Sequence, residues 1–127
     1  MADINITFQD LPLQNGSNAK HVSFVGQLDE TNVDSEAQKV YQVINEMMPP
    51  FLILDFTGLE YMNSKSIGYV TDWYTQAMGK QGSIAIVNPP ANILDILKVV
   101  GITQIMQVYS TLEEAQAALS SAGGTQA

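Results

Sequence analysis

Two short and almost wholly apolar runs constrain the fold of this chain more than any other feature. They are residues 51–56 (FLILDF) and 83–88 (SIAIVN), and each has the pattern of a strand that is buried on both faces of a sheet. Residues 64–80 lie between them and carry a core stripe at helical spacing: Ile67, Val70, Thr71, Tyr74, Ala77 and Met78. Strands that alternate with helices of this length are typical of a mostly parallel sheet with packed helices.

The N-terminal part of the chain predicts two neighbouring strands. Ile4, Ile6 and Phe8 alternate with polar residues, which is typical of a half-buried strand, and residues 21–26 (HVSFVG) form a second strand pattern. The turn-rich residues 9–20 between them are expected to form a loop. Because two neighbouring strands with no helix between them are most simply antiparallel, we expect a mixed sheet.

A first helix is expected ahead of the run that begins at residue 51. Thr31 is placed to cap it, and Asp34 lies in its first turn, where the helix dipole favours negative charge. Pro49 and Pro50 end the pattern. The helix should present one apolar face, formed by Val33, Ala37, Val40, Ile44, Met47 and Met48.

The remaining residues predict a short helix, a strand and a final helix. The short helix ends at Gly101, residues 105–109 form the last strand, and Thr111 with Glu114 has the spacing of a capping box at the start of the final helix. The whole order predicts an α/β fold with a four- or five-stranded mixed β-sheet packed with about four α-helices. We expect one domain over residues 1–119 and a flexible tail over residues 120–127.

Charge and composition narrow the class of partner. The chain has 5 Lys and Arg residues against 13 Asp and Glu, a net charge of −8, and such a surface repels nucleic acids and anionic membranes. No apolar run approaches the roughly 20 residues that span a bilayer, and the N-terminus lacks the pattern of a signal peptide. The lack of cysteine fits a reducing compartment. We expect a cytoplasmic protein, a monomer or weak homodimer, with no direct nucleic acid binding and no membrane insertion.

The sequence contains no recognisable catalytic constellation. It has neither of the common glycine-rich phosphate-binding loops. With one histidine, His21, and no cysteine, the chain lacks the parts of a catalytic triad or a typical zinc site. Asp29 and Asp55 lie near predicted strand ends, but structural roles in a turn and at a strand end are favoured over acid–base work. We therefore expect no enzymatic activity, no metal and no cofactor.

A polar segment, Asn63-Ser64-Lys65-Ser66, stands where the second predicted helix should begin, just after the first buried strand. Asn63 is a good N-cap, so Ser64 becomes the first helical residue. The positive end of the helix dipole stabilises an anion here, and a phosphate on Ser64 would add about 1.5 to 2 negative charges with Lys65 as a nearby countercharge. The alternative is that Asn and Ser merely cap a helix.

Three segments, in the correct order, resemble the STAS family, which is named for sulfate transporters and anti-sigma factor antagonists. Residues 25–31 (VGQLDET) resemble a G-x-L-D-x-x-T segment that includes Asp29. Residues 52–68 (LILDFTGLEYMNSKSIG) resemble a strand, turn and helix start written as hydrophobics followed by D-L-S-x-V-x-x-[MI]-D-S-[ST]-G-L-G. Residues 97–119 resemble the C-terminal part of the family, with a helix, a Gly-[LI] turn, a strand and an E-E-A helix.

The resemblance implies a function in partner switching. In the antagonist branch, the serine of D-S-[ST]-G is phosphorylated, and this position corresponds to Ser64. The unmodified protein binds an anti-sigma factor, often itself a serine protein kinase, and frees the sigma factor. Phosphorylation ends the complex, because a doubly charged group at the docking surface imposes repulsion and desolvation. The resemblance thus implies an anti-sigma factor antagonist-like regulator, with Asp29, Asn63, Ser64, Lys65 and Ser66 expected on the partner-binding surface.

The motif around Ser64 departs from the family at three positions. Asn63 stands in place of Asp, Lys65 in place of Ser or Thr, and Ser66 in place of Gly. Asn63 removes a charge that a kinase can read, and Ser66 adds a side chain where a partner approaches closely. These differences leave open a second function: a phosphorylation-independent STAS scaffold, or an accessory subunit of a stress-signalling or lipid-transport complex.

Tyr69 and Trp73 are four residues apart and are expected on a flank of the second helix, away from its core stripe. A Tyr/Trp pair beside Ser64 resembles an interface anchor, so both residues are candidates for partner binding. The alternative is that Trp73 packs beneath a neighbouring loop.

Overall fold

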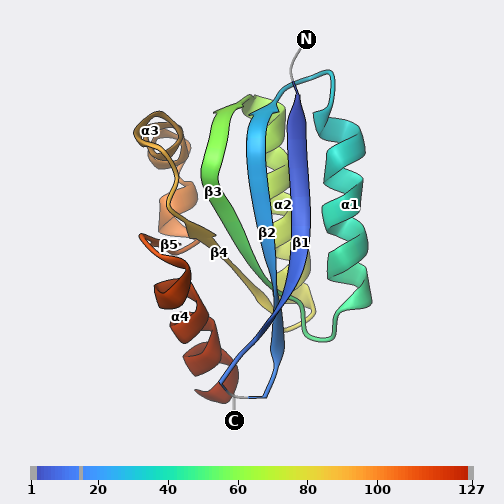
Figure 1. Ribbon diagram of the computed structural model, residues 1–127, viewed down its shortest axis with the longest axis vertical. Helices are drawn as coiled ribbons and strands as arrows, with labels where there is room; N and C mark the ends of the chain where they lie inside the picture. Colours follow the sequence, from blue (N-terminus) through green and yellow to red (C-terminus); the bar gives the residue numbers. More distant parts are fainter. Residues whose placement is uncertain (1–2, 15, 126–127) are drawn as a thin grey trace.

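The computed structural model describes residues 3–14 and 16–125, which form a five-stranded sheet with helices on both faces (Figure 1). The strands lie in the order β1-β2-β3-β4-β5; β1 runs antiparallel to β2, and the other neighbours are parallel. This confirms the predicted mixed sheet. The elements are β1 (Ile4–Pro12), β2 (Asn18–Leu28), α1 (Val33–Glu46), β3 (Phe51–Met62), α2 (Ser64–Gly79), β4 (Ser83–Val87), α3 (Ala91–Val99), the 3-10 turn η1 (Ile102–Gln104), β5 (Val108–Tyr109) and α4 (Leu112–Thr125).

The two faces of the sheet carry different helices. Helices α1 and α2 pack on one face, and α4 packs on the other (Figure 1). In β3 the side chains alternate between two buried clusters: Leu52, Leu54 and Phe56 enter the larger cluster with α1, α2 and α3, while Phe51 and Ile53 enter the smaller one beneath α4. Burial on both faces explains why this run is almost uninterrupted in its hydrophobicity, as the sequence predicted.

The first three strands are longer than their apolar patterns indicate. Most of residues 9–20, expected as a loop, belongs to strands, since Gln9 pairs with His21 and Asp10 with Lys20. Likewise, β3 continues past the apolar run to Met62, with register shifts against β2. Backbone pairing does not require an apolar side chain, so a ladder extends into polar sequence that hydrophobic periodicity cannot detect.

Helix α1 has the predicted inward face but a different start. Val33, Ala37, Val40 and Ile44 are buried as expected, whereas Met48 lies beyond the helix and is 82% exposed. The predicted cap at Thr31 is wrong, because the helix begins at Val33 and Asn32 occupies the N-cap position. Thr31 instead donates hydrogen bonds to Asp29 within the preceding turn.

The C-terminal elements differ from the predictions at two places. The strand expected at 105–109 is reduced to β5, because η1 follows the left-handed Gly101 (φ 86°), and Ile105 is 49% exposed. Helix α4 continues to Thr125, into the segment expected as a tail, and the buried Ser120 accepts a hydrogen bond from the backbone N–H of Gln14 (3.1 Å). Residues 126–127 of that segment lie outside the described part of the chain.

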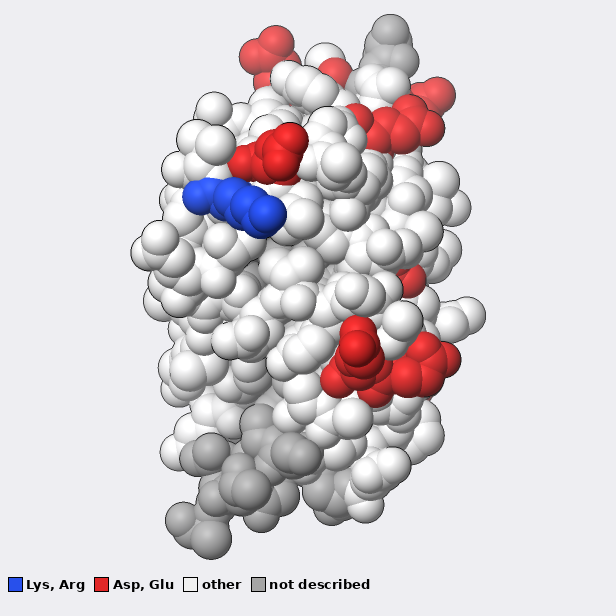
Figure 2. Space-filling model, turned by 90° about the vertical axis from the view of Figure 1, so that its left-hand side faces the viewer, with Lys and Arg blue, Asp and Glu red and all other residues white. Residues whose placement is uncertain are grey.

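The face that carries α3 and α4 has few charged side chains, and most of these are acidic (Figure 2). A wide uncharged area separates them. The exposed large apolar residues of the α3–η1 region are Val99, Val100 and Ile105. None of the helices in the described ranges has the length and apolar character needed to span a membrane. This surface therefore presents mainly negative charge and uncharged area.

Candidate functional site

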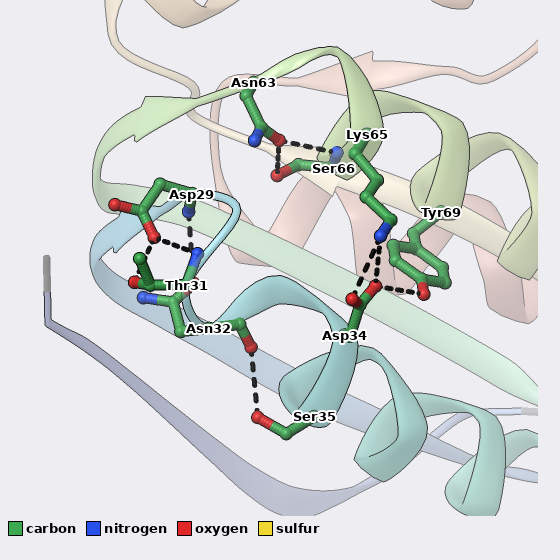
Figure 3. Close-up of polar contacts among 9 residues, drawn as sticks. All are labelled: Asp29, Thr31, Asn32, Asp34, Ser35, Asn63, Lys65, Ser66 and Tyr69. Atoms are coloured by element: carbon green, nitrogen blue, oxygen red, sulfur yellow. Dashed lines mark hydrogen bonds and ion pairs between the residues drawn. The ribbon is translucent and has the colours of Figure 1, made fainter.

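The joint between β3 and α2 is held by the side chain of Asn63. Its Oδ1 accepts hydrogen bonds from the backbone N–H of Ser66 (2.9 Å) and from the Ser66 hydroxyl (2.6 Å) (Figure 3). Asn63 is therefore the N-cap of α2, as predicted, and Ser64 is its first residue. Just before it, the buried Met62 anchors the end of β3 in the core.

The two serines of the joint face opposite environments. Ser66 is 1% exposed, and its Oγ also lies 3.3 Å from the carbonyl oxygen of Leu28 at the end of β2. Ser64, by contrast, is exposed, as is Lys65. The expectation that Ser66 lies on the partner-binding surface is therefore wrong: its side chain helps to cap α2 and points into the fold.

The turn between β2 and α1 lies beside this joint and is bound together by its own side chains. The Asp29 carboxylate accepts hydrogen bonds from the backbone N–H (2.9 Å) and hydroxyl (2.6 Å) of Thr31. The Asn32 side chain accepts from the backbone N–H of Asp29 (3.1 Å) and donates to the carbonyl of Gln27 (2.9 Å). The hydrogen bonds from Thr31 hold the pKa of Asp29 below its ordinary value. Asp29 thus has the turn position that the sequence predicted.

An open depression of about 450 Å³ brings the turn and the joint together. It is lined by Gln27, Asp29, Glu30, Tyr61 and Asn63. Two residues predicted for the partner-binding surface, Asp29 and Asn63, therefore line the same hollow, immediately beside the exposed Ser64. Tyr61 was not predicted here because the apolar pattern of β3 ends before it.

Lys65 and Tyr69 connect α2 to the first turn of α1. The Lys65 ammonium lies 2.9 Å from the Asp34 carboxylate, and the Tyr69 hydroxyl donates to Asp34 Oδ1 at 2.7 Å (Figure 3). The hydrogen bond from Tyr69, followed by that from Lys65, lowers the pKa of Asp34, while the same contacts raise the pKa values of Lys65 and Tyr69. The sequence indicated Asp34 only as part of a helix start, because no local pattern links it to residues on α2.

Trp73 belongs to the core, and its predicted position on an outer flank is wrong. Its side chain is 1% exposed and packs against the rings of Phe24, Tyr41 and Tyr69, with centroid distances of 6.2, 6.4 and 6.4 Å. The buried face of α2 is Ser66, Val70, Trp73 and Ala77. Treating Ser66 as a surface residue rotated the predicted stripe toward Ile67, Thr71, Tyr74 and Met78, which are half-buried or exposed.

The two candidate carboxylates have separate partners. Asp55 Oδ2 lies 2.8 Å from Nε2 of His21 on β2, and Asp55 Oδ1 accepts from the N–H (3.0 Å) and hydroxyl (2.6 Å) of Thr57. Burial raises the pKa of Asp55, but the hydrogen bonds from Thr57 and His21 outweigh it and leave the pKa lowered. In the part of the chain that the structure describes, no three His, Asp or Glu side chains are grouped to hold a metal ion.

This arrangement defines a class of small α/β domain, in which a mixed sheet presents a capped helix start with an exposed serine beside the β2–α1 turn. The chain belongs to the STAS domain family, which matches residues 11–115. The family expected from the three sequence segments is thereby confirmed.

Solved structures give the same fold at low sequence identity. The chain is similar to an anti-sigma factor antagonist from Mycobacterium paratuberculosis, with 20% identity, 92% of this chain and 94% of that chain covered, and a TM-score of 0.79. It is also similar to the antagonist SpoIIAA in its unphosphorylated form (22% identity, 86% and 92% covered, TM-score 0.68). The phosphorylated form of Bacillus SpoIIAA gives 22% identity, 86% and 96% coverage and a TM-score of 0.62.

A membrane transporter contains a similar unit. Murine Solute Carrier 26 family member A9, an anion transporter, is 18% identical, with 91% of this chain and 22% of the transporter covered and a TM-score of 0.69. At these identities the likeness concerns the fold. Comparison with curated proteins gives no match.

Proposed function

We propose that this chain is an anti-sigma factor antagonist that acts by partner switching and is controlled by phosphorylation of Ser64. In its unmodified form it binds an anti-sigma factor that is also a serine protein kinase, which frees the sigma factor. The kinase then transfers phosphate to Ser64, and the complex dissociates. The protein acts by binding, in the cytoplasm, and catalyses no reaction itself.

The observation that carries this proposal is the difference in exposure between Ser64 and Ser66. A kinase must reach the hydroxyl that it modifies, and Ser64 is exposed while Ser66 is buried and hydrogen-bonded to Asn63. Ser64 is also the first residue of α2, where unpaired backbone N–H groups and the helix dipole stabilise a negative group. Geometry therefore favours the serine that matches the family's phosphorylated position.

The surroundings of Ser64 explain how phosphate would end binding. The proposed docking surface consists of Ser64 and its exposed or half-buried neighbours Asp29, Asn63, Lys65 and Tyr69. Glu30 and Asp34 add further negative charge to the same end of the molecule. A phosphate adds about 1.5 to 2 negative charges there. A partner fitted to the neutral hydroxyl would then meet repulsion and the cost of desolvating the phosphate.

Relatives support the class of mechanism. The neighbours with this fold include proteins described as anti-sigma factor antagonists, and SpoIIAA occurs in both an unphosphorylated and a phosphorylated form. Those relatives share the fold with this chain, and the exposed Ser64 supplies the hydroxyl that such a mechanism needs.

The direct experiment is capture of partners from the native cell with the tagged chain, followed by mass spectrometry of the partners and of Ser64. We expect an anti-sigma factor of the serine kinase type, with more recovered by Ser64→Ala than by wild type, and phosphate on Ser64 of the wild type. Ser110→Ala, which changes an exposed serine beyond β5, is the matched control. Recovery of neither a kinase nor an anti-sigma factor, with Ser64 unmodified, would contradict the proposal.

A phosphorylation-independent scaffold or accessory subunit is the second candidate. Two observations favour it: Lys65 is paired with Asp34 rather than free beside Ser64, and a domain of the same fold occurs within an anion transporter. In this case the chain would bind a stress-signalling or lipid-transport assembly through the same end. Partner recovery would then be equal for wild type, Ser64→Ala and Ser64→Asp.

A further inference from the structure

Lys65 follows the proposed phosphorylation site directly, yet its charge is directed to a different element. Its ammonium pairs with Asp34 at the start of α1, and the Tyr69 hydroxyl shares that carboxylate (Figure 3). Both members of the ion pair are open to solvent, with 56% of the Lys65 side chain and 57% of the Asp34 side chain exposed. The ion pair therefore connects the first turn of α2 to the first turn of α1.

A phosphate on Ser64 would compete with Asp34 for the same lysine. An exposed ion pair contributes about 0–1 kcal/mol in general, so little free energy holds Lys65 in place. A phosphoserine dianion carries up to twice the charge of a carboxylate and three strong acceptor oxygens, and Coulomb attraction at equal distance rises in proportion. The other groups that face Lys65 are the Tyr69 hydroxyl and the Glu30 carboxylate. Neither carries a positive charge, so neither can neutralise a phosphate.

We propose that Lys65 is a phosphate-responsive latch, which leaves Asp34 and pairs with the phosphate when Ser64 is modified. The inference rests on the proposed function, because it requires phosphate at Ser64. Asp34 keeps the hydrogen bond from Tyr69 but loses its counterion and becomes a free negative charge at the start of α1. The effect of modification thus spreads from Ser64 to a second element of the docking surface.

The latch can be tested without any kinase by installing phosphoserine at position 64 during translation. The second pKa of phosphoserine, about 6 in the absence of perturbation, is followed by phosphorus NMR. If Lys65 pairs with the phosphate, this pKa is lower in the otherwise wild-type protein than in Lys65→Gln. Lys39→Gln is the matched control, since Lys39 on α1 is also 56% exposed and pairs with Glu36.

A second readout follows Asp34. Amide hydrogen exchange in the first turn of α1 should be faster in the phosphoserine protein than in the unmodified protein, and unmodified Lys65→Gln should reproduce the increase. A phosphoserine pKa that is the same with Lys65 and with Gln at position 65 would overturn the latch. So would faster exchange in α1 of unmodified Lys65→Gln with no increase in the phosphoserine protein. Because phosphate is supplied directly, these results are separate from whether a cellular kinase modifies Ser64, which the partner capture tests.

Discussion

Nε2 of His21 on β2 lies 2.8 Å from Oδ2 of Asp55 on β3, so a side-chain contact joins two neighbouring parallel strands of the sheet. The two side chains are only 18% and 19% exposed. Thr57 donates two hydrogen bonds to the other carboxylate oxygen, so both oxygens of Asp55 have hydrogen-bond partners. The Asp55 carboxylate therefore helps to hold β2 and β3 together.

This contact predicts a dependence of stability on pH. The pKa of Asp55 is lowered on folding, so its contribution is fully present above the ordinary value of 3.8 and is lost as the pH falls through the lower folded pKa. Asp55→Asn should reduce the free energy of unfolding at pH 7 by about 1–3 kcal/mol, the usual cost of losing hydrogen bonds to a charged group. Chemical denaturation at several pH values should show the gap from wild type closing below pH 4. Asp95→Asn, an exposed change on α3, is the control; a gap independent of pH would refute this role.

Trp73 should matter for stability. Removing a large buried aromatic side chain costs about 3–5 kcal/mol, so Trp73→Ala should lower the free energy of unfolding by that amount. Tyr61→Ala is a matched control, because this aromatic residue is 48% exposed, and it should change stability little. Thermal and urea denaturation measure both. A stable Trp73→Ala protein that has lost only partner binding would return Trp73 to the surface role that its sequence spacing predicted.

Gly82 should not tolerate a side chain. A Cβ at this position would lie 1.8 Å from the carbonyl oxygen of Pro50, which is a backbone atom, so the chain must shift to admit it. Gly82→Ala should therefore destabilise the protein, whereas Gly68→Ala, where a Cβ meets no atom within 4 Å, should be neutral or slightly stabilising. Equal melting temperatures for the two variants would show that the turn between α2 and β4 does not require glycine at position 82.

The cap at Asn63 can be separated from any role in binding. Asn63→Ala should cost about 0.5–2 kcal/mol, because the backbone N–H of Ser66 loses its acceptor. Asn63→Asp should retain the cap, since a carboxylate accepts the same bond and is favoured by the helix dipole. Urea denaturation compares the two. If Asn63→Asp is as unstable as Asn63→Ala, the side-chain oxygen is not what holds the start of α2.

The sequence predicted the sheet and the helix order because these depend on local patterns. The run at residues 51–56 indicated a strand buried on both faces, and Asn63 indicated the start of α2. The same reasoning misplaced Trp73, since counting Ser66 as polar and therefore exposed shifted the inward face of α2 by one residue. A hydroxyl whose acceptor is supplied locally can be buried, and Asn63 supplies it.

The composition of the candidate site was predicted in part. Asp29 and Asn63 line one hollow where the joint and the β2–α1 turn meet, and Ser64 and Lys65 follow Asn63 directly in the chain. The contact of Lys65 with Asp34 could not be predicted, because it joins residues on two helices whose relative position is set by packing on the sheet. Polar contacts of this kind depend on tertiary structure and leave no periodic signal in the sequence.

Control by phosphorylation of Ser64 is tested most directly by the affinity of the captured kinase-type partner for this chain with and without phosphate on Ser64. We expect Ser64→Ala to bind as tightly as the unmodified protein and phosphoserine to raise Kd at least tenfold, which is about 1.4 kcal/mol. Ser64→Asp should fall between them, because it carries one charge and fewer acceptor oxygens. Ser110→Ala should bind like wild type. Equal Kd values for all four proteins and the phosphorylated form would contradict control at Ser64.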